Sequence, residues 1–362
     1  MHVPQLAQGL KQRGHHVWVA AFPGSPLFNE AKKQGLSVFP FSTSSYFHPK
    51  QLVQLTKFIR SQDIQIIHSH FSRDLWTIVP ALRWSQSRAG LFLTKHIGTQ
   101  SPKRDFVHKW LYARVNRLFA NSEVIRKNLI ETHPVSPKRV ETLHLGIDLQ
   151  RYRPRPELKK PVRRELGIPP NAVVFAIAGR LQRAKGYFEF IQMAEELATR
   201  FGQAYFLLIG GASRGEEKEA ERIRERAASS SAANRLIFTG FRPDVERILQ
   251  AADVFVFPSY AEAYGLVVLE AMAVGLPVIS SNCDGILDIV LEGVTGELVP
   301  PKKARELVRV AVRFIENPKL RERYGRAGLR RIQEEFDWHH MLDKLLLQYE
   351  LVFRKSQRQS SL

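Results

Sequence analysis

Short apolar runs rich in β-branched and aromatic residues alternate along the chain with longer segments whose apolar positions recur at helical spacing. Each apolar run predicts a buried strand, and each longer segment predicts a helix that covers it. Strands that alternate with helices are typical of a parallel sheet with helices on both faces, so the pattern predicts the α/β class. The predicted strands are 16–21, 36–41, 64–68, 91–95, 118–121, 140–145, 173–178, 205–209, 236–238, 254–257, 277–280 and 296–299. The predicted helices include 4–13, 50–61, 75–84, 106–115, 123–132, 340–353 and 303–316, which is expected to end before Pro318.

The alternation is interrupted at residues 151–161, RYRPRPELKKP, where three prolines and a run of charges indicate an interdomain linker. We therefore predict an N-terminal domain over residues 1–152 and a C-terminal domain over residues 153–338. A final helix within residues 339–362 is predicted to pack back on the first domain. Open parallel sheets bind ligands at the carboxyl ends of their strands, so the crevice between the two domains is the expected site.

The composition agrees with two soluble domains, since 44% of the 362 residues are apolar and 25% are charged. No apolar run reaches the ~18 residues of a membrane span, and the first residues lack the charged-then-apolar order of a signal peptide. The single cysteine, Cys283, excludes an internal disulfide and is expected to be a small packing residue. A cytoplasmic protein is therefore expected.

The formal net charge of +19 is concentrated in the first half, where residues 1–150 hold 20 Lys and Arg against 8 Asp and Glu. Such a field attracts a polyanionic partner, which could be nucleic acid, an anionic membrane surface or an acidic substrate. A generally basic proteome is the alternative explanation. Nucleic-acid binding would need interleaved aromatic residues on a strand face or a helix-turn-helix, and the sequence shows neither, so no nucleic-acid partner is expected.

The stretch SYAEAYGLVVLEAMAVGLPVISS (259–281) places a helix directly after a strand end. Tyr264, Gly265 and Leu266 fall in its first turn, where unpaired backbone N–H groups and the helix dipole favour an anion such as phosphate. Glu262 precedes that turn, and Glu270 lies inside the helix. Two carboxylates beside an anion site are suited to accept hydrogen bonds from a polyol attached to the anion, although two ordinary solvated glutamates are the alternative.

A second candidate loop, GRLQRAKG (179–186), follows the predicted strand 173–178. Its glycines let the backbone turn away from the strand end, and Arg180 and Lys185 bring two cations that a diphosphate would accept. The loop differs from a Walker A loop and from GxGxxG, which argues against a P-loop ATPase and a standard dinucleotide oxidoreductase.

Histidine and acidic motifs give no metal site. His68 and His70 lie two positions apart, but no Cys or carboxylate pair completes a set of ligands, so a structural role is favoured. The chain contains no Asp-x-Asp, and Asp244 of the nearest acidic pair is expected to lie in a helix N-terminal cap region.

GRLQRAKG, LIFTGFRPDVERILQAADVFVFPSYAEAYGLVVLEAMAVGLPVISS and GVTGELVPP resemble the donor-binding domain of glycosyltransferase family 4, retaining sugar-nucleotide transferases of the GT-B fold. HVWVA, IQIIHSH, LTKH, LFANSE and HLGIDLQRYRP extend the resemblance over nearly the whole chain. The resemblance implies two Rossmann-like domains that face each other across a cleft. It also implies sugar transfer from a nucleotide diphosphate sugar to a hydroxyl acceptor, with the anomeric configuration retained and without a metal or other cofactor.

The resemblance also implies roles for individual residues. Glu262 would bind the donor sugar near the reacting centre, and Glu270 would bind the nucleotide ribose. Arg180 and Lys185 would bind the diphosphate and stabilise the charge that develops on the leaving group. The remaining implied contacts are the base beside Phe241 and Arg242, the phosphates at the backbone of Tyr264, Gly265 and Leu266, and the donor sugar at His96 of the first domain.

The acceptor is expected on the basic first half. The segment PKRDFVHKWLYARVNR (102–117) places basic residues beside Phe106, Trp110 and Tyr112, a composition suited to an anionic membrane surface. We therefore expect a lipid-linked, lipopolysaccharide or other cell-envelope glycan acceptor, and a cytoplasmic protein that attaches reversibly to the inner face of the membrane. The alternative is that the aromatic residues pack on the sheet while the cations face water.

The sequence departs from the family at its start, where an opening strand and a glycine-rich loop normally precede the helix that begins here near Pro4. Either the start is truncated or the first domain lacks its opening strand, and a missing strand exposes the backbone of its neighbour. Two other functions stay open. One is a GT-B relative that acts on the sugar nucleotide without an acceptor, such as a phosphorylase or an epimerase, and the other is a non-catalytic basic nucleic-acid-binding protein.

Overall fold

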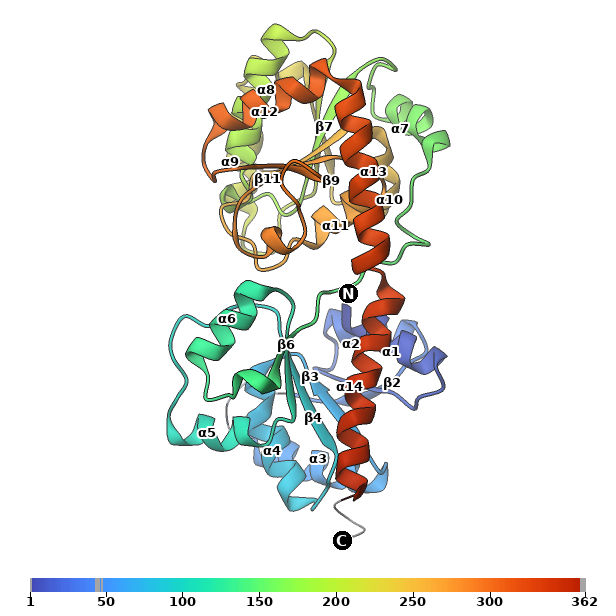
Figure 1. Ribbon diagram of the computed structural model, residues 1–362, viewed down its shortest axis with the longest axis vertical. Helices are drawn as coiled ribbons and strands as arrows, with labels where there is room; N and C mark the ends of the chain where they lie inside the picture. Colours follow the sequence, from blue (N-terminus) through green and yellow to red (C-terminus); the bar gives the residue numbers. More distant parts are fainter. Residues whose placement is uncertain (1, 43–45, 47, 359–362) are drawn as a thin grey trace. The chain divides into compact units, whose positions relative to one another are not determined.

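The structure, a computed structural model, describes residues 2–42, 46 and 48–358. It contains two compact units (Figure 1), each with parallel strands and covering helices. Unit 1 comprises the described residues up to His144 together with those from His339 onward, and unit 2 is Leu145–Trp338. None of the helices in the described ranges combines the length and the apolar character that a bilayer span requires.

Unit 2 contains one parallel sheet in the order β12-β11-β10-β7-β8-β9. Its strands are β7 (Val173–Ala178), β8 (Ala204–Ile209), β9 (Leu236–Gly240), β10 (Val254–Phe257), β11 (Val278–Ser281) and β12 (Gly296–Val299). This is the doubly wound order, in which the direction of winding reverses between the first strand, β7, and the fourth, β10. Because ligands bind beyond the carboxyl ends of strands at such a reversal, the strand order predicts a ligand site at the loops that follow β7 and β10.

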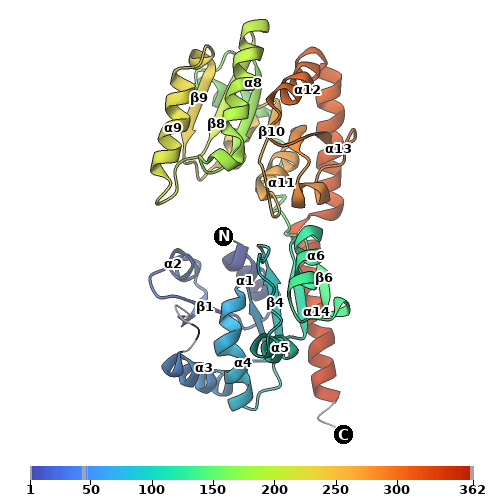
Figure 2. The same ribbon diagram turned by 90° about the vertical axis from the view of Figure 1, so that its left-hand side faces the viewer.

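Alternate residues of β7 enter two different cores, as expected for a strand buried on both faces. Val174, Ala176 and Ala178 pack with α11 (Leu266–Ala273), whereas Val173, Phe175 and Ile177 pack with α8 (Tyr187–Arg200) and α12 (Ala304–Glu316). Helix α9 (Glu217–Ala228) covers the same face of the sheet as α8 and α12. Figure 2 shows α8 and α9 against β8 and β9. The other face is covered by α7 (Lys159–Glu165), α10 (Val245–Ile248), α11 and the C-terminal part of α13 (Pro318–Glu335). Ile332 of α13 lies in this core, whereas Leu320 and Tyr324 lie in the core formed with α8 and α12.

Unit 1 contains two parallel sheets, β1-β2 and β3-β4-β5-β6. The strands are β1 (Trp18–Ala21), β2 (Ser37–Pro40), β3 (Ile66–Ser69), β4 (Gly90–Lys95), β5 (Arg117–Ala120) and β6 (Val140–Thr142). Within the described residues β1 pairs only with β2, and β3 pairs only with β4. An opening strand of a doubly wound sheet would lie between β1 and β3, which is where the sheet is discontinuous.

The helices of unit 1 are α1 (His2–Gln12), α2 (Pro26–Lys33), α3 (Pro49–Ser61), α4 (Leu75–Trp84), α5 (Phe106–Ala113), α6 (Glu123–Thr132) and α14 (Trp338–Arg358). Helix α14 packs on the larger sheet through Tyr349, whose ring lies 4.8 Å from that of Phe92. The hydroxyl of Tyr349 also lies 2.5 Å from His68 Nδ1, so buried contacts connect α14 to β3 and β4.

The prediction of an α/β fold with two Rossmann-like domains is confirmed, and four details differ. The division falls before Leu145 rather than after Tyr152, because Tyr152 is buried in the core of unit 2. Helix α7 begins at the end of the predicted linker, at Lys159, and buries Val162 against that core. Helix α2 was missed, although the Ser25 hydroxyl accepts a hydrogen bond from Phe28 N and caps it. Helix α13 was also missed, because Pro318 occupies its first turn instead of only following α12.

Candidate active site

The loops after β7 and β10 meet at the carboxyl edge of the unit 2 sheet. Tyr260 N donates to Ala184 O over 2.8 Å, and Lys185 Nζ lies 2.5 Å from Glu262 Oε2. About four-fifths of each charged side chain is removed from solvent, since 20% of Lys185 and 18% of Glu262 remain exposed. Gly186 permits this close approach, because a Cβ there would lie 2.2 Å from Pro258 O and the φ angle is +78°. The structure thus brings together two residues that the sequence predicted for one site.

The loop after β11 fixes the backbone of Glu262. Asp284 Oδ2 accepts a hydrogen bond of 3.0 Å from Glu262 N, and Gly285 N donates to Glu262 O over 2.9 Å. A Cβ at Gly285 would lie 2.2 Å from Ala263 O, so glycine is required for this contact. Asp284 is a residue that the sequence analysis missed, and its one signal is the Asp-Gly pair that follows a strand.

Arg180 lies on the surface of the same edge and pairs with a residue from the loop after β8. Its Nη1 is 3.0 Å from Glu216 Oε1, which also accepts a hydrogen bond of 2.5 Å from Gln182 Nε2. The two loops approach so closely that a Cβ at Gly210 would lie 1.8 Å from Gly179 O. Glu216 was not singled out from the sequence, where it belongs to the ordinary acidic run GEEKEA.

Glu270 is partly buried and hydrogen-bonded rather than a fully solvated helix residue. Burial raises the pKa of its carboxyl from 4.5 to about 7, while the hydrogen bond from Tyr152 and the charge of Arg151 act in the opposite direction. The Tyr152 hydroxyl donates to Glu270 Oε1 over 2.9 Å. The sequence predicts that Tyr152 lies in the linker, and local spacing gives no sign of its contact with Glu270.

The first turn of α11 is exposed only in part. Gly265, in the left-handed conformation with φ +87°, precedes the helix, and a Cβ there would lie 2.5 Å from Ile286 Cδ1. The Tyr264 side chain is buried and donates its hydroxyl to Leu145 O over 2.6 Å, which leaves only its backbone for a ligand. Leu266 begins the helix and is 41% exposed.

Phe241 and Arg242 follow β9 but differ in their surroundings. The Phe241 ring is 81% exposed. The Arg242 guanidinium donates from Nε and Nη2 to the carboxylate of Asp244, each over 2.8 Å, and lies 3.4 Å from Glu165. Asp244 occupies the N-cap position of α10, as expected, but its carboxylate pairs with arginine and makes no side-chain cap bond to the helix.

His96 follows β4 in unit 1 and pairs with another histidine. Its Nε2 lies 3.2 Å from His70 Nδ1, and the two rings are nearly parallel at an angle of 17°. Burial and then the charge of Lys95 lower the pKa of His96, so the imidazole is neutral at pH 7. His68 contacts Thr94 and Tyr349. In the described part of the chain, no group of three or more His, Cys, Asp or Glu residues is arranged to hold a metal ion.

Helix α5 presents an aromatic surface beside its cations. Phe106 is 82% exposed and Trp110 is 37% exposed, whereas Leu111 is buried. The alternative that these aromatic residues pack on the sheet is therefore wrong for Phe106.

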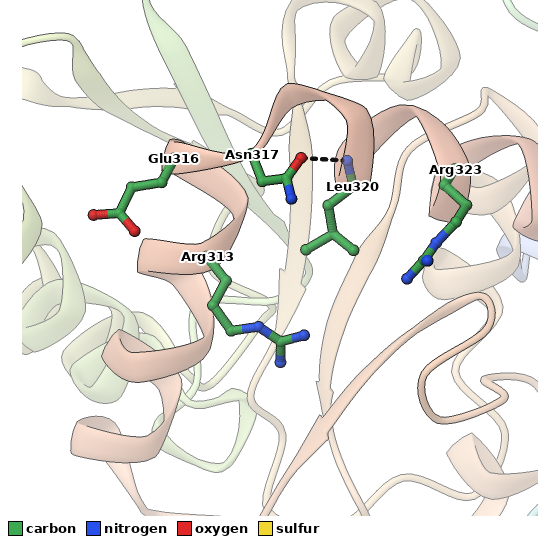
Figure 3. Close-up of a pocket in the computed structure, with 5 residues that line it drawn as sticks. All are labelled: Arg313, Glu316, Asn317, Leu320 and Arg323. Carbon is green, nitrogen blue, oxygen red and sulfur yellow. Dashed lines mark hydrogen bonds between the residues drawn. The ribbon is translucent and has the colours of Figure 1, made fainter.

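Neither the single cysteine nor a hollow elsewhere on unit 2 adds a reactive group to the candidate site. Cys283 is buried, and burial raises the pKa of its thiol to about 11, so it is not a thiolate at pH 7. Figure 3 shows a shallow hollow at the turn from α12 to α13, where Asn317 Oδ1 accepts a hydrogen bond of 3.0 Å from Leu320 N. Helix α12 follows β12 and runs from the carboxyl ends of the strands toward their amino ends. The C-terminal end of α12 and this hollow therefore lie at the opposite ends of the strands from Lys185.

Two family models match successive parts of the chain. The model described as "Glycosyltransferase Family 4" matches residues 1–151, and the model described as "Glycosyl transferases group 1" matches residues 159–331. Together with the doubly wound sheets, these matches define an enzyme of the glycosyltransferase class with the GT-B fold. The carboxyl-edge loops with Lys185 and Glu262 lie inside the second match. The chain belongs to glycosyltransferase family 4.

Individual relatives agree with this assignment. The chain is similar to D-inositol 3-phosphate glycosyltransferase of Nocardia farcinica, with 29% identity over 327 residues that cover 83% of this chain and 71% of the relative. A solved glycosyltransferase from Rickettsia africae has a TM-score of 0.86 at 20% identity and covers 96% of this chain and 93% of that one. HepE of Anabaena in complex with UDP has a TM-score of 0.85 at 20% identity and covers 96% and 94%.

Proposed function

We propose that the protein is a retaining glycosyltransferase that moves a sugar from a nucleotide diphosphate sugar to a hydroxyl of a lipid-linked or other cell-envelope glycan. The observation that carries the proposal is the contact of Lys185 with Glu262 at the reversal point of the unit 2 sheet. A cation and a carboxylate side by side suit a ligand that joins a diphosphate to a polyol. HepE, which is similar in fold, was solved with UDP-glucose.

The reaction breaks the bond between the anomeric carbon and the diphosphate oxygen and forms a bond from that carbon to the acceptor oxygen. Negative charge develops on the leaving diphosphate, where Lys185 and Arg180 stabilise it. Glu262 accepts hydrogen bonds from the sugar. The acceptor attacks from the face that the diphosphate leaves, and the departing phosphate takes the acceptor proton, so that no side-chain nucleophile and no metal ion is required.

The nucleoside end of the donor uses the buried and the exposed groups around α11. The ionised form of Glu270 accepts hydrogen bonds from the ribose, and the backbone N–H groups at Gly265 and Leu266 contact the phosphates. The exposed Phe241 ring contacts the base. Arg242 is held by Asp244 and Glu165 and supports the loop that carries Phe241. The neutral His96 imidazole contacts the donor sugar.

The basic surface of α5 supports an acceptor that lies at a membrane. Phe106 and Trp110 provide exposed aromatic area beside Lys103, Arg104 and Lys109, and such surfaces bind anionic bilayers by insertion and charge together. In low-salt flotation the protein is expected to float with vesicles that contain anionic lipid and not with neutral vesicles. Phe106→Ser should reduce flotation, whereas Trp84→Ser, which alters another exposed aromatic side chain at the end of α4, should not. Equal flotation with both vesicle types would refute the membrane contact.

Product formation separates the proposed reaction from its alternatives. The protein is incubated with nucleotide diphosphate sugars alone and then with a panel of glycan and lipid-linked acceptors, and products are identified by mass and by NMR of the anomeric proton. A new glycoside with the anomeric configuration of the donor, formed only with acceptor, is expected. An altered sugar nucleotide formed without acceptor would instead identify an epimerase, and an inverted product would refute retention.

A further inference from the structure

The two cations of the candidate active site have carboxylate partners of different kinds. Lys185 pairs with Glu262, which belongs to the proposed site, whereas Arg180 pairs with Glu216, for which the proposed reaction has no role. Glu216 comes from the loop between β8 and α9, and its Oε1 lies 3.0 Å from Arg180 Nη1. A diphosphate that binds Arg180 therefore approaches a guanidinium that already has an anion beside it.

The position of Glu216 is fixed by its surroundings. Gln182 Nε2 donates to the same oxygen, Oε1, that Arg180 contacts. Gly179 N bonds to Ile209 O over 2.9 Å, which joins the loop that carries Arg180 to the strand end that leads to Glu216. Oε2 of Glu216 is buried and accepts no hydrogen bond from the residues that the structure describes. A carboxylate with one oxygen removed from water is screened less than an exposed one, so its charge acts more strongly on a neighbouring anion.

We propose that Glu216 determines the preference of the site between the donor and the released nucleoside diphosphate, because it competes with the diphosphate for Arg180. The inference rests on the proposed function, in which Arg180 binds the diphosphate. The terminal phosphate of a nucleotide diphosphate sugar is esterified, whereas the released nucleoside diphosphate has a free terminal phosphate with an additional ionisable oxygen. Repulsion increases with charge, so Glu216 opposes the product more strongly than the donor and promotes product release.

The proposal is tested by binding of two matched ligands to Glu216→Gln. The nucleoside diphosphate that wild type binds most tightly is chosen from UDP, GDP and ADP, and its affinity and that of its glucose ester are measured by calorimetry. Glutamine keeps the size of the side chain and can still accept from Arg180, but it removes the negative charge. The variant should bind the nucleoside diphosphate about tenfold tighter and the glucose ester about threefold tighter, so that the preference for the donor falls.

Glu219→Gln is the matched control. Glu219 lies in the first turn of α9, three residues after Glu216, and its Oε1 accepts a hydrogen bond from the backbone N of Arg183. Glu219→Gln should leave both affinities within about twofold of wild type, because the carboxylate of Glu219 does not lie beside the Arg180 guanidinium. Weaker nucleotide binding by Glu216→Gln would overturn the proposal and make Glu216 a residue that only orients Arg180. Equal tightening of both ligands, or the same tightening in Glu219→Gln, would also overturn it. If wild type binds none of the three nucleoside diphosphates, the proposed function itself fails.

Discussion

Glu270 should make nucleotide binding sensitive to pH close to neutrality. Burial raises the pKa of its carboxyl to about 7, and the carboxylate accepts hydrogen bonds from the ribose hydroxyls more strongly than the neutral acid does. Binding should therefore weaken as the pH falls through about 7. The effect on folding has the opposite sign, because the folded state favours the protonated acid. The contribution of protonated Glu270 to the free energy of unfolding is fully present below pH 4.5 and is lost as the pH rises through 7. For a pKa shift of this size that contribution is about 3 kcal/mol.

Tyr152→Phe tests this reasoning because it removes one hydroxyl and keeps the buried ring. The hydroxyl lies 2.9 Å from Glu270 Oε1 and favours the ionised form. A hydrogen bond to a charged group contributes roughly 1.5 kcal/mol, which corresponds to about one pKa unit. The midpoint of the pH dependence should therefore move up by about one unit, and nucleotide affinity at pH 7.5 should fall about threefold.

The assay is calorimetric titration of a nucleoside diphosphate between about pH 5.5 and pH 8.5. The 2′,3′-dideoxy analogue is the control, because it carries the same titrating phosphates without the hydroxyls that Glu270 binds. Wild type should show a midpoint near pH 7 with the ribonucleotide and lose that dependence with the analogue. The reasoning is refuted if Tyr152→Phe has the same midpoint as wild type, or if the analogue shows the same dependence as the ribonucleotide.

Three further predictions concern the remaining parts of the site. Gly210→Ala should destabilise the protein by roughly 3 kcal/mol in thermal unfolding, because its Cβ would lie 1.8 Å from Gly179 O. The control is Gly202→Ala, whose Cβ meets nothing within 4 Å, and equal melting temperatures of the two variants would contradict the prediction. Phe241→Ala should weaken nucleotide binding about tenfold, and unchanged affinity in calorimetry would remove this exposed ring from the base contact. His96→Asn should slow transfer about tenfold or more without changing nucleoside diphosphate affinity, and a wild-type rate would exclude a contact with the sugar.

The fold was predictable where the local pattern decides the structure. Strands such as β7 read as continuous apolar runs because both faces are buried, and the alternation with helices then implies a parallel sheet. The missed helices α2 and α13 begin with a proline, Pro26 and Pro318, a residue that interrupts a helix when it lies in the interior. Pro318 occupies the first turn of α13 after the Asn317 cap, and Pro161 lies inside α7 at the predicted linker.

The candidate site was predictable only through the loops that carry motifs. Lys185 and Glu262 belong to two such loops, and the sheet order then brings the loops together. Tyr152 and Glu216 could not be found in this way. Tyr152 contacts a residue 118 positions away, and Glu216 contacts Arg180 from a loop without a motif. Both contacts depend on which strands are neighbours, and local spacing does not encode that information.

The most direct test of the account is the transfer rate of Lys185→Ala, measured with the donor and acceptor that wild type uses. Lys185 and Glu262 form the contact on which the donor site is assigned. The variant should retain the circular dichroism of wild type and lose transfer by about 10²-fold or more, because the charge on the leaving diphosphate is no longer stabilised. A folded Lys185→Ala protein that transfers sugar at nearly the wild-type rate would contradict the account.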